Sequence, residues 1–327
     1  MINPRNILVI QTAFIGDVVL ATALAEDIHK HFSNAEITFL VRKGNESLFE
    51  AHPFVMNTLV WDKKNDKYRN LWRLIKEVRK QKFDCVLNLQ RFAAAGMVAA
   101  LSGAKWIVGF QKNPLSPWFT HKVEHVIGVG HEIQRNAKLL TAISNESAGS
   151  LPKLYPTESQ YRRVKEYTEQ PFITMSPTSV WKTKAAPPIF WTKLIDAHPN
   201  YTVYLLGGPS DFEACQSILE QSRGNKVFNL CGKLSLMESA ALMDSAQMNF
   251  TNDSAPMHLC SAMNAPVTAM YCSTVPAFGF GPLSDQARIL ETHQHLDCRP
   301  CGLHGHKDCP KGHFKCGDLD PNEVAIA

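Results

Sequence analysis

Short β-rich runs of apolar residues alternate with helical patterns along most of this chain. The run 6–10 has the composition of a buried strand, and apolar residues then recur at helical spacing through 17–32. Strands that are joined by helices pair in parallel, and the helices cover both faces of the sheet. The pattern therefore predicts an α/β protein with two doubly wound sheets. The strand candidates fall at 6–10, 36–41, 58–61, 83–89 and 105–110 in a first series, and at 172–176, 201–206, 226–229, 248–251 and 266–271 in a second.

A polar stretch rich in Gly and Ser, residues 144–150, separates the two series. A chain of 327 residues also suits two domains, at roughly 150 residues each. We therefore expect an N-terminal domain over residues 1–149 and a C-terminal domain over residues 150–327, two Rossmann-like domains facing a central cleft. Ligands of such sheets bind beyond the carboxyl ends of the strands, so the turns after the strands are the candidate sites.

Composition and charge disfavour several classes of protein. The formal net charge of +4 is too mild to indicate nucleic-acid binding, which needs a stronger and more clustered basic excess. No apolar run approaches the ~18 to 20 residues that span a bilayer. The N-terminus passes from a short polar lead into a strand-like run, without the pattern of a signal peptide. We expect a cytoplasmic protein.

The first strand-to-helix turn, residues 11–17, contains a single glycine. A dinucleotide-binding turn needs three, so an NAD-type oxidoreductase is disfavoured. The turn ends in a carboxylate, Asp17, at the start of a helix and the mouth of a sheet. An Asp at such a place is commonly a helix cap, because free N–H groups and the helix dipole favour it. It can also act as a catalytic base, and the two roles are compatible.

Three turns of the second series carry polar groups. Residues 176–184 combine several hydroxyls with two lysines, which indicates either a phosphate cradle or an exposed polar loop. Residues 205–211 place paired glycines at a strand end, where a ligand can approach the backbone closely. Residues 252–258, Asn-Asp-Ser-Ala-Pro-Met-His, lead from a strand into a helix whose N-terminal N–H groups suit a diphosphate. A helix cap accounts for Asp253, but not for the whole string.

The motifs of this chain resemble, in order, the successive signatures of glycosyltransferase family 9, the ADP-heptose:lipopolysaccharide heptosyltransferases. The matching segments are residues 16–23, 183–184, 206–211 and 252–258. The stretches 274–282 and 298–316 extend the resemblance, which is strongest to heptosyltransferase II-like members. The resemblance implies the GT-B architecture. It also implies metal-independent, inverting transfer of heptose from an ADP-heptose donor to the inner core of lipopolysaccharide, without a cofactor.

The resemblance assigns roles by matching position. Asp17 would be the general base of an acceptor-binding N-terminal domain, and Lys184 would hold the donor diphosphate without a metal ion. The partners implied are the nucleotide sugar and a lipopolysaccharide core or lipid A precursor. The chain departs from the family pattern just after Lys184, at Ala185-Ala-Pro187. The implied donor-binding residues are Thr178, Ser179, Lys184, Asp211, Asp253, Ser254, Ala255 and His258.

Two segments lie outside these motifs. Residues 63–82 hold nine Lys or Arg beside an apolar stripe at Leu71, Ile75 and Val78. Such a segment can make peripheral contact with an anionic inner membrane, or it is an ordinary surface helix packed by its stripe, which we favour. The second segment gathers four thiols, which can bind zinc. Its spacing lacks a second C-x2-C pair, so we expect no metal and reduced thiols at Cys298, Cys301, Cys309 and Cys316.

Three other functions fit parts of the same sequence. A GT-B enzyme with a different nucleotide sugar or acceptor would share the fold, since function depends on the site. A non-catalytic nucleotide- or glycan-binding protein is a second alternative, and the intact Asp17 argues against it. A metal-binding interaction module rests on the C-terminal cysteines alone.

Overall fold

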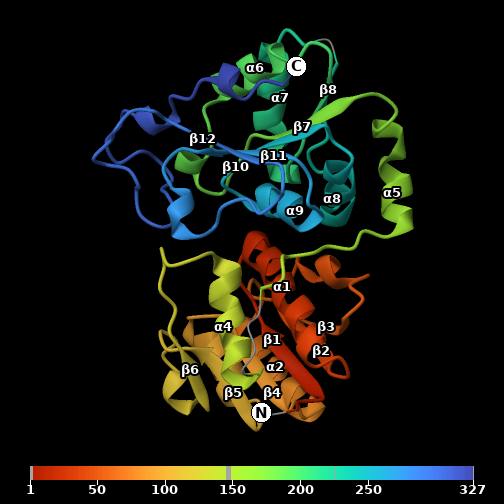
Figure 1. The fold of residues 1–327 in the computed structure, drawn as a ribbon, viewed down its shortest axis with the longest axis vertical. Coiled ribbons are helices and arrows are strands. Elements are labelled where there is room, and N and C mark those ends of the chain that lie inside the picture. Colours follow the sequence, from red (N-terminus) through yellow and green to blue (C-terminus); the bar gives the residue numbers. More distant parts are fainter. Residues whose placement is uncertain (1–2, 145–148, 225, 327) are drawn as a thin grey trace. The chain divides into compact units, whose positions relative to one another are not determined.

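The computed structural model describes residues 3–144, 149–224 and 226–326. The chain divides into two compact units, Met1–Tyr155 (unit 1) and Pro156–Ala327 (unit 2). Each unit is built on a six-stranded sheet in which neighbouring strands run parallel (Figure 1). The predicted α/β class with two doubly wound sheets is therefore confirmed.

Unit 1 has the strand order β3-β2-β1-β4-β5-β6. Helix α2 packs against α3, and both lie on the sheet face that carries Leu8 and Ile10. Side chains alternate along a strand, so Ile7 and Val9 face the other side, where α1 packs against α4. The elements are β1 (Asn6–Ile10), α1 (Ile15–His31), β2 (Glu36–Arg42), β3 (Val55–Trp61), α2 (Lys67–Gln81), β4 (Cys85–Asn88), α3 (Ala93–Ala100), β5 (Trp106–Phe110), β6 (His121–Val123) and α4 (Glu132–Ser144).

Unit 2 has the strand order β12-β11-β10-β7-β8-β9. Helix α6 packs against α7, and α8 packs against both α5 and α9. The elements are α5 (Glu158–Val164), β7 (Phe172–Ser176), α6 (Pro188–Asp196), β8 (Thr202–Leu205), α7 (Phe212–Gln221), β9 (Val227–Asn229), α8 (Leu236–Asp244), β10 (Met248–Asn252), α9 (Ala255–Met263), β11 (Val267–Tyr271) and β12 (Ala287–Glu291).

Both sheets share one winding. Numbered within each unit, the strands stand in the order 3-2-1-4-5-6, the dinucleotide-fold order. The order reverses between β1 and β4 in unit 1, and between β7 and β10 in unit 2. Open α/β sheets bind their ligands outside the carboxyl ends of the strands at this reversal. The turns after β1, β7 and β10 are therefore the candidate binding positions.

Two strands, β6 and β12, were not predicted. β6 is the edge strand opposite β3 in the unit 1 sheet, and β12 is the edge strand opposite β9 in the unit 2 sheet. β6 is three residues long, and most of β12 is exposed, so neither has the continuous apolar run of a buried strand. Every predicted strand is present, with bounds that differ by a few residues at most.

The expected linker at 144–150 lies largely outside the described residues, which exclude 145–148. The residues from 149 to 155 are hydrogen-bonded to α1. The buried carboxylate of Asp27 accepts the N–H groups of Gly149 and Ser150 at 3.2 and 2.9 Å. The Tyr155 hydroxyl donates to Glu26 at 2.6 Å. These bonds explain why unit 1 extends to Tyr155.

The basic segment 63–82 contains α2. Its apolar stripe is buried in the core of unit 1, as expected for a helix that packs on the sheet. Its two aromatic residues lie outside that stripe, since Tyr68 is 73% and Trp72 53% exposed. Among the described residues, no helix is both long and apolar enough to cross a bilayer.

Candidate active site

Asn252, the last residue of β10, ties the loop after β7 to the sheet. Its side-chain amide donates to the carbonyl oxygens of Ser176 at 3.2 Å and Thr178 at 3.4 Å. Its Oδ1 accepts the N–H of Ala186 at 2.9 Å. The side chain is completely buried, so these bonds form away from competing water. One residue thereby holds both ends of the loop 177–186.

Lys184 lies on this loop and forms an ion pair with Asp253. The Lys184 Nζ atom is 2.6 Å from Asp253 Oδ2, and the two side chains are 15% and 7% exposed. The Thr274 hydroxyl donates to the same Oδ2 at 2.6 Å. The turns after β7, β10 and β11 thus bring these three side chains together. An ammonium group has three N–H donors, so Lys184 can pair with Asp253 and still donate to a bound anion.

Asp253 is not the helix cap that its position suggested. Helix α9 begins at Ala255, and its N-cap is Ser254. The first turn includes Pro256, which has no N–H, and Met257 donates its N–H to the Ser254 carbonyl at 3.1 Å. The first-turn amides that can meet an anion are therefore those of Ser254 and Ala255.

The remaining donor-binding candidates differ in position. Thr178 and Ser179 are half-buried on the loop that Asn252 holds, and His258 is buried in the first turns of α9. Asp211 lies after β8, where its Oδ2 accepts the N–H of Gly208 at 2.7 Å. That bond closes a local turn, which is a structural role.

Two ionisable side chains near Asp253 remain neutral at pH 7. Burial and the charge of Asp253 raise the pKa of Tyr271 well above its ordinary value. Burial also raises the pKa of the Cys272 thiol. Neither group therefore adds a charge beside the Lys184–Asp253 pair.

In unit 1, Asp17 lies after β1 at the sheet reversal. Helix α1 begins at Ile15 with Phe14 as its N-cap, so the interpretation of Asp17 as the cap residue is wrong. Asp17 instead belongs to the first turn, where the helix dipole stabilises an anion. It is half-buried.

The turn before Asp17 is held by a lysine. Lys63 Nζ donates to the carbonyl of Thr12 at 2.5 Å and lies 3.0 Å from the Thr12 hydroxyl. Burial, and then the charges of Arg42 and Lys67, lower the pKa of Lys63 to about 8. The Arg42 guanidinium lies over the ring of Phe14. Positive charge therefore gathers beside the turn that leads to Asp17.

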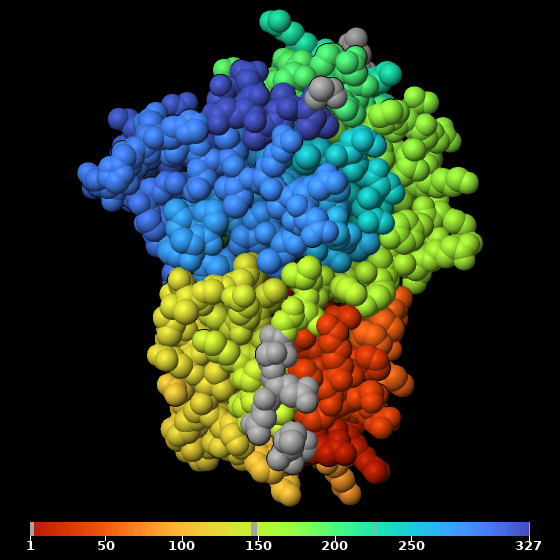
Figure 2. Space-filling view, in the orientation of Figure 1, coloured from red at the N-terminus to blue at the C-terminus, as the bar shows by residue number. Residues whose placement is uncertain are grey.

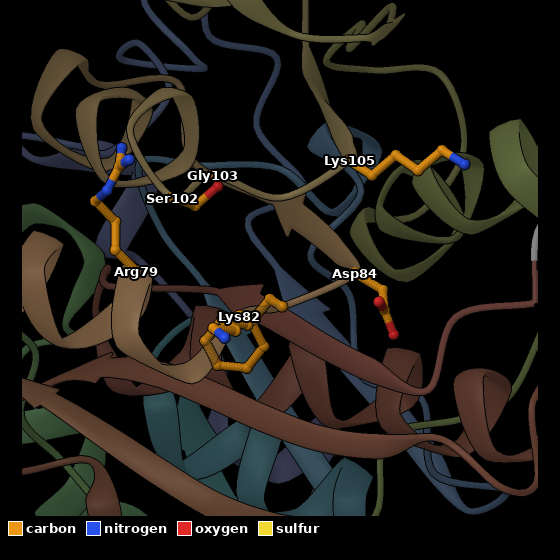
Figure 3. A pocket seen from close by; sticks show the side chains of 7 residues that line it. Arg79, Lys82, Asp84, Ser102, Gly103 and Lys105 are labelled. Carbon is orange, nitrogen blue, oxygen red and sulfur yellow. The ribbon is translucent and has the colours of Figure 1, made fainter.

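Unit 1 also has a pocket at the edge of its sheet where the strands begin, opposite the edge that leads to Asp17. It lies around residues that precede β4 and β5, and Figure 3 shows the charged ends of Arg79 and Lys105 pointing apart. The Asp84 carboxylate in it already accepts the N–H groups of Arg5 and Asn6. The pocket has neither the position nor the convergent groups of a catalytic site. Its lining residues are Arg79, Lys82, Phe83, Asp84, Ser102, Gly103 and Lys105.

The four clustered cysteines are free thiols. Cys298 Sγ lies 3.9 Å from His313 Nε2, and Cys301 Sγ lies 3.0 Å from the carbonyl oxygen of Cys298. In the described part of the chain, no group of three or more His, Cys, Asp or Glu side chains is arranged to hold a metal ion.

Sequence reasoning missed Asn252 and Thr274 as site residues. Asn252 was part of the recognised string, but its role depends on loop carbonyls more than 70 positions away. Thr274 follows β11, and the signal that could have found it is its place at a strand end next to β10.

Comparisons with known proteins agree with this architecture. Residues 71–308 match the model of glycosyltransferase family 9 (heptosyltransferase). Lipopolysaccharide heptosyltransferase 3 of Escherichia coli is 27% identical over 278 residues, which cover 80% of this chain and 82% of the relative.

Two solved structures have a similar fold. The ADP-heptose LPS heptosyltransferase II of E. coli has a TM-score of 0.81 at 21% identity, covering 98% of this chain and 96% of that one. A family 9 glycosyltransferase of Veillonella parvula has a TM-score of 0.81 at 24% identity, covering 88% and 86%. The chain therefore belongs to glycosyltransferase family 9, the heptosyltransferases, and is a glycosyltransferase with the GT-B α/β fold.

Proposed function

We propose that this enzyme transfers heptose from ADP-heptose to the inner core of lipopolysaccharide, with inversion at the anomeric carbon. The observation that carries the proposal is the meeting of Lys184, Asp253 and Thr274 at the reversal of the unit 2 sheet. A lysine and a helix N-terminus at this place suit the diphosphate of a nucleotide sugar. Two of the relatives named above, both from Escherichia coli, are lipopolysaccharide heptosyltransferases.

On the donor side, the leaving group is a diphosphate whose negative charge grows as the sugar departs. Lys184 and the amides of Ser254 and Ala255 would stabilise that charge, so the reaction needs no metal ion. His258 would donate to phosphate, and the hydroxyls of Thr178 and Ser179 would line the same loop. Both contacts of the Asp253 carboxylate are made by Oδ2, so Oδ1 can accept a sugar hydroxyl.

On the acceptor side, we propose Asp17 as the general base. It would remove the proton from the acceptor hydroxyl that attacks the anomeric carbon, and a single displacement of this kind inverts the configuration. Arg42 and Lys63, beside the turn that leads to Asp17, carry charge that suits an anionic core acceptor. An acceptor that carries a lipid also places the enzyme at the cytoplasmic face of the inner membrane.

ADP should stabilise the protein against heat, whereas NAD should not, because the site offers a diphosphate cradle without the three-glycine turn. The protection should persist in EDTA. Equal protection by NAD, or loss of protection by ADP on chelation, would overturn the donor assignment.

Lys184→Ala should weaken ADP binding by about 1.5 to 3 kcal/mol, the range of a charge-assisted contact. Lys182→Ala is the matched control. Lys182 is on the same loop, but its ion pair with Asp308 is exposed, with side chains 79% and 80% accessible. Calorimetric titration should show unchanged ADP affinity for the control. The same result for Lys184→Ala would remove Lys184 from the site.

Replacing two buried asparagines of β10, one at a time, distinguishes a role in holding the loop 177–186 from a general contribution to stability. Asn252 and Asn249 are both completely buried with three hydrogen bonds each, but Asn249 bonds Thr174, Met243 and Pro266. Replacing either by Ala should cost about 2 to 4 kcal/mol of unfolding free energy, measured in denaturant. Only Asn252→Ala should also weaken ADP binding. Equal loss of affinity in both variants would contradict the proposed role of the loop.

Asp17→Asn tests the base directly. Asn keeps the size and polarity of the side chain but cannot accept the acceptor proton. We expect a melting temperature within a few degrees of the parent, unchanged ADP affinity, and turnover reduced at least ~100-fold, since general-base assistance is typically worth ~10² to 10⁴ in rate. Near-parental turnover by the folded variant would exclude Asp17 as the base.

We also propose peripheral membrane contact through the exposed aromatic and basic side of α2. Trp72 and Tyr68 stand among lysines and arginines, a combination that suits the interface of an anionic bilayer. The protein should float with vesicles of anionic lipid, and Trp72→Ala should reduce the floated fraction. Trp118→Ala, which removes another exposed tryptophan at 64% accessibility, is the control. Flotation that is unaffected by Trp72→Ala would exclude this surface.

A further inference from the structure

The loop that carries Lys184 is bound to a segment far away in the sequence. Thr183 donates its N–H to the carbonyl of His306 at 3.1 Å, and its hydroxyl accepts the N–H of His306 at 2.8 Å. The Thr183 carbonyl accepts the N–H of Ser273 at 3.2 Å, and the two hydroxyls lie 3.1 Å apart. All three polar atoms of Thr183 are therefore engaged, and Thr183 and Ser273 are buried.

Gly305 lies directly against these groups. Its φ of +71° is in the left-handed region, and a Cβ built on it would stand 2.8 Å from the hydroxyl oxygens of both Ser273 and Thr183. The same Cβ would stand 3.1 Å from Cγ of Lys184. Such distances require the neighbours to move. Glycine at 305 is thus required both by its backbone conformation and by this close contact with the stem of Lys184.

The segment that holds Gly305 is itself anchored to the end of β11. Cys301 donates its N–H to the Ser273 carbonyl at 2.8 Å, and the Arg299 guanidinium donates to the carbonyls of Cys272 at 2.6 Å and Thr274 at 2.8 Å. In Figures 1 and 2 the chain beyond β12, in the deeper blues, forms loops at the surface of unit 2. These loops are held to the sheet at the same strand end that presents Thr274 to Asp253.

We propose that Thr183, Ser273, Gly305 and His306, which we call the clasp, position the Lys184 side chain for the donor diphosphate. The inference rests on the proposed role of Lys184. The loop turn that bears it is only three residues long, Lys182–Lys184, and cannot fix a long flexible side chain by itself. The clasp fixes the residue before Lys184 on both sides and bounds the stem of Lys184 through Gly305. The four are positioning residues, since they act through Lys184.

The chain offers a matched pair of glycines for the test. Gly302 has a φ of +75°, close to that of Gly305, but a Cβ there meets nothing within 4 Å. Alanine at either position carries the same backbone strain, and only Gly305→Ala adds a methyl group that presses on Thr183 and Lys184. We expect Gly305→Ala to weaken ADP binding at least ~10-fold by calorimetry and to raise the KM for donor more than it lowers kcat. Gly302→Ala should stay within ~2-fold of the parent.

A double-mutant cycle with Lys184→Ala shows whether the effect passes through the lysine. Gly305→Ala should weaken ADP binding less than ~2-fold when Lys184 is already absent. An equal loss in both backgrounds, or no loss in the parent, would overturn the proposal. If Lys184→Ala alone leaves ADP affinity unchanged, the proposed donor role of Lys184 fails instead, which is a different outcome.

Thr183→Val provides the same test if Gly305→Ala does not fold. Valine keeps the size of the side chain and removes the hydroxyl that bonds His306 and Ser273. ADP binding should weaken, and Thr183→Ser, which retains the hydroxyl, should restore it. Failure of the serine variant to restore affinity while its melting temperature matches the parent would contradict the clasp.

Discussion

The ion pair between Lys184 and Asp253 is the interaction around which the unit 2 site is organised. Both side chains are mostly buried, and removing two charges from water is favourable only with close pairing and further hydrogen bonds. Thr274 supplies one such bond to the shared carboxylate oxygen. The surrounding backbone must therefore be held firmly, and three separate strand ends contribute to it. Asn252 holds the loop at both ends, and Thr183 is held between Ser273 and His306.

The two units have the same strand order, but they present different chemical groups where that order reverses. In unit 2 the reversal of the sheet presents an ammonium group and a helix N-terminus, which favour an anionic leaving group. In unit 1 the same place presents a carboxylate in the first turn of α1, beside a turn held by Lys63. The inverting sugar transfer that we propose needs both groups, because one must stabilise a departing diphosphate and the other must remove a proton.

Much of the fold could be predicted from the sequence because buried parallel strands are continuous apolar runs. The run at 6–10 coincides with β1 and the run at 172–176 with β7. The edge strands β6 and β12 lack this signal, because β6 is only three residues long and most of β12 is exposed. The site was predictable only in part. Strand-end position was enough to mark Asp253 and the two loop lysines, Lys182 and Lys184, as candidates, and the family resemblance then selected Lys184. The ion pair between Lys184 and Asp253 could not be predicted. Nor could the contact of Thr183 with His306, 123 positions away, because no local sequence pattern encodes such contacts.

The central claim is that this family 9 chain moves heptose from ADP-heptose to a lipopolysaccharide core acceptor by a single displacement. The most direct measurement is to incubate the protein with isotopically labelled ADP-heptose and a heptose-deficient core acceptor, and to analyse the product by mass spectrometry and NMR. The account predicts an acceptor heavier by one labelled heptose, one ADP released per transfer, and an anomeric configuration opposite to that of the donor. An acceptor that gains no heptose, or a product that retains the donor's configuration, would contradict it.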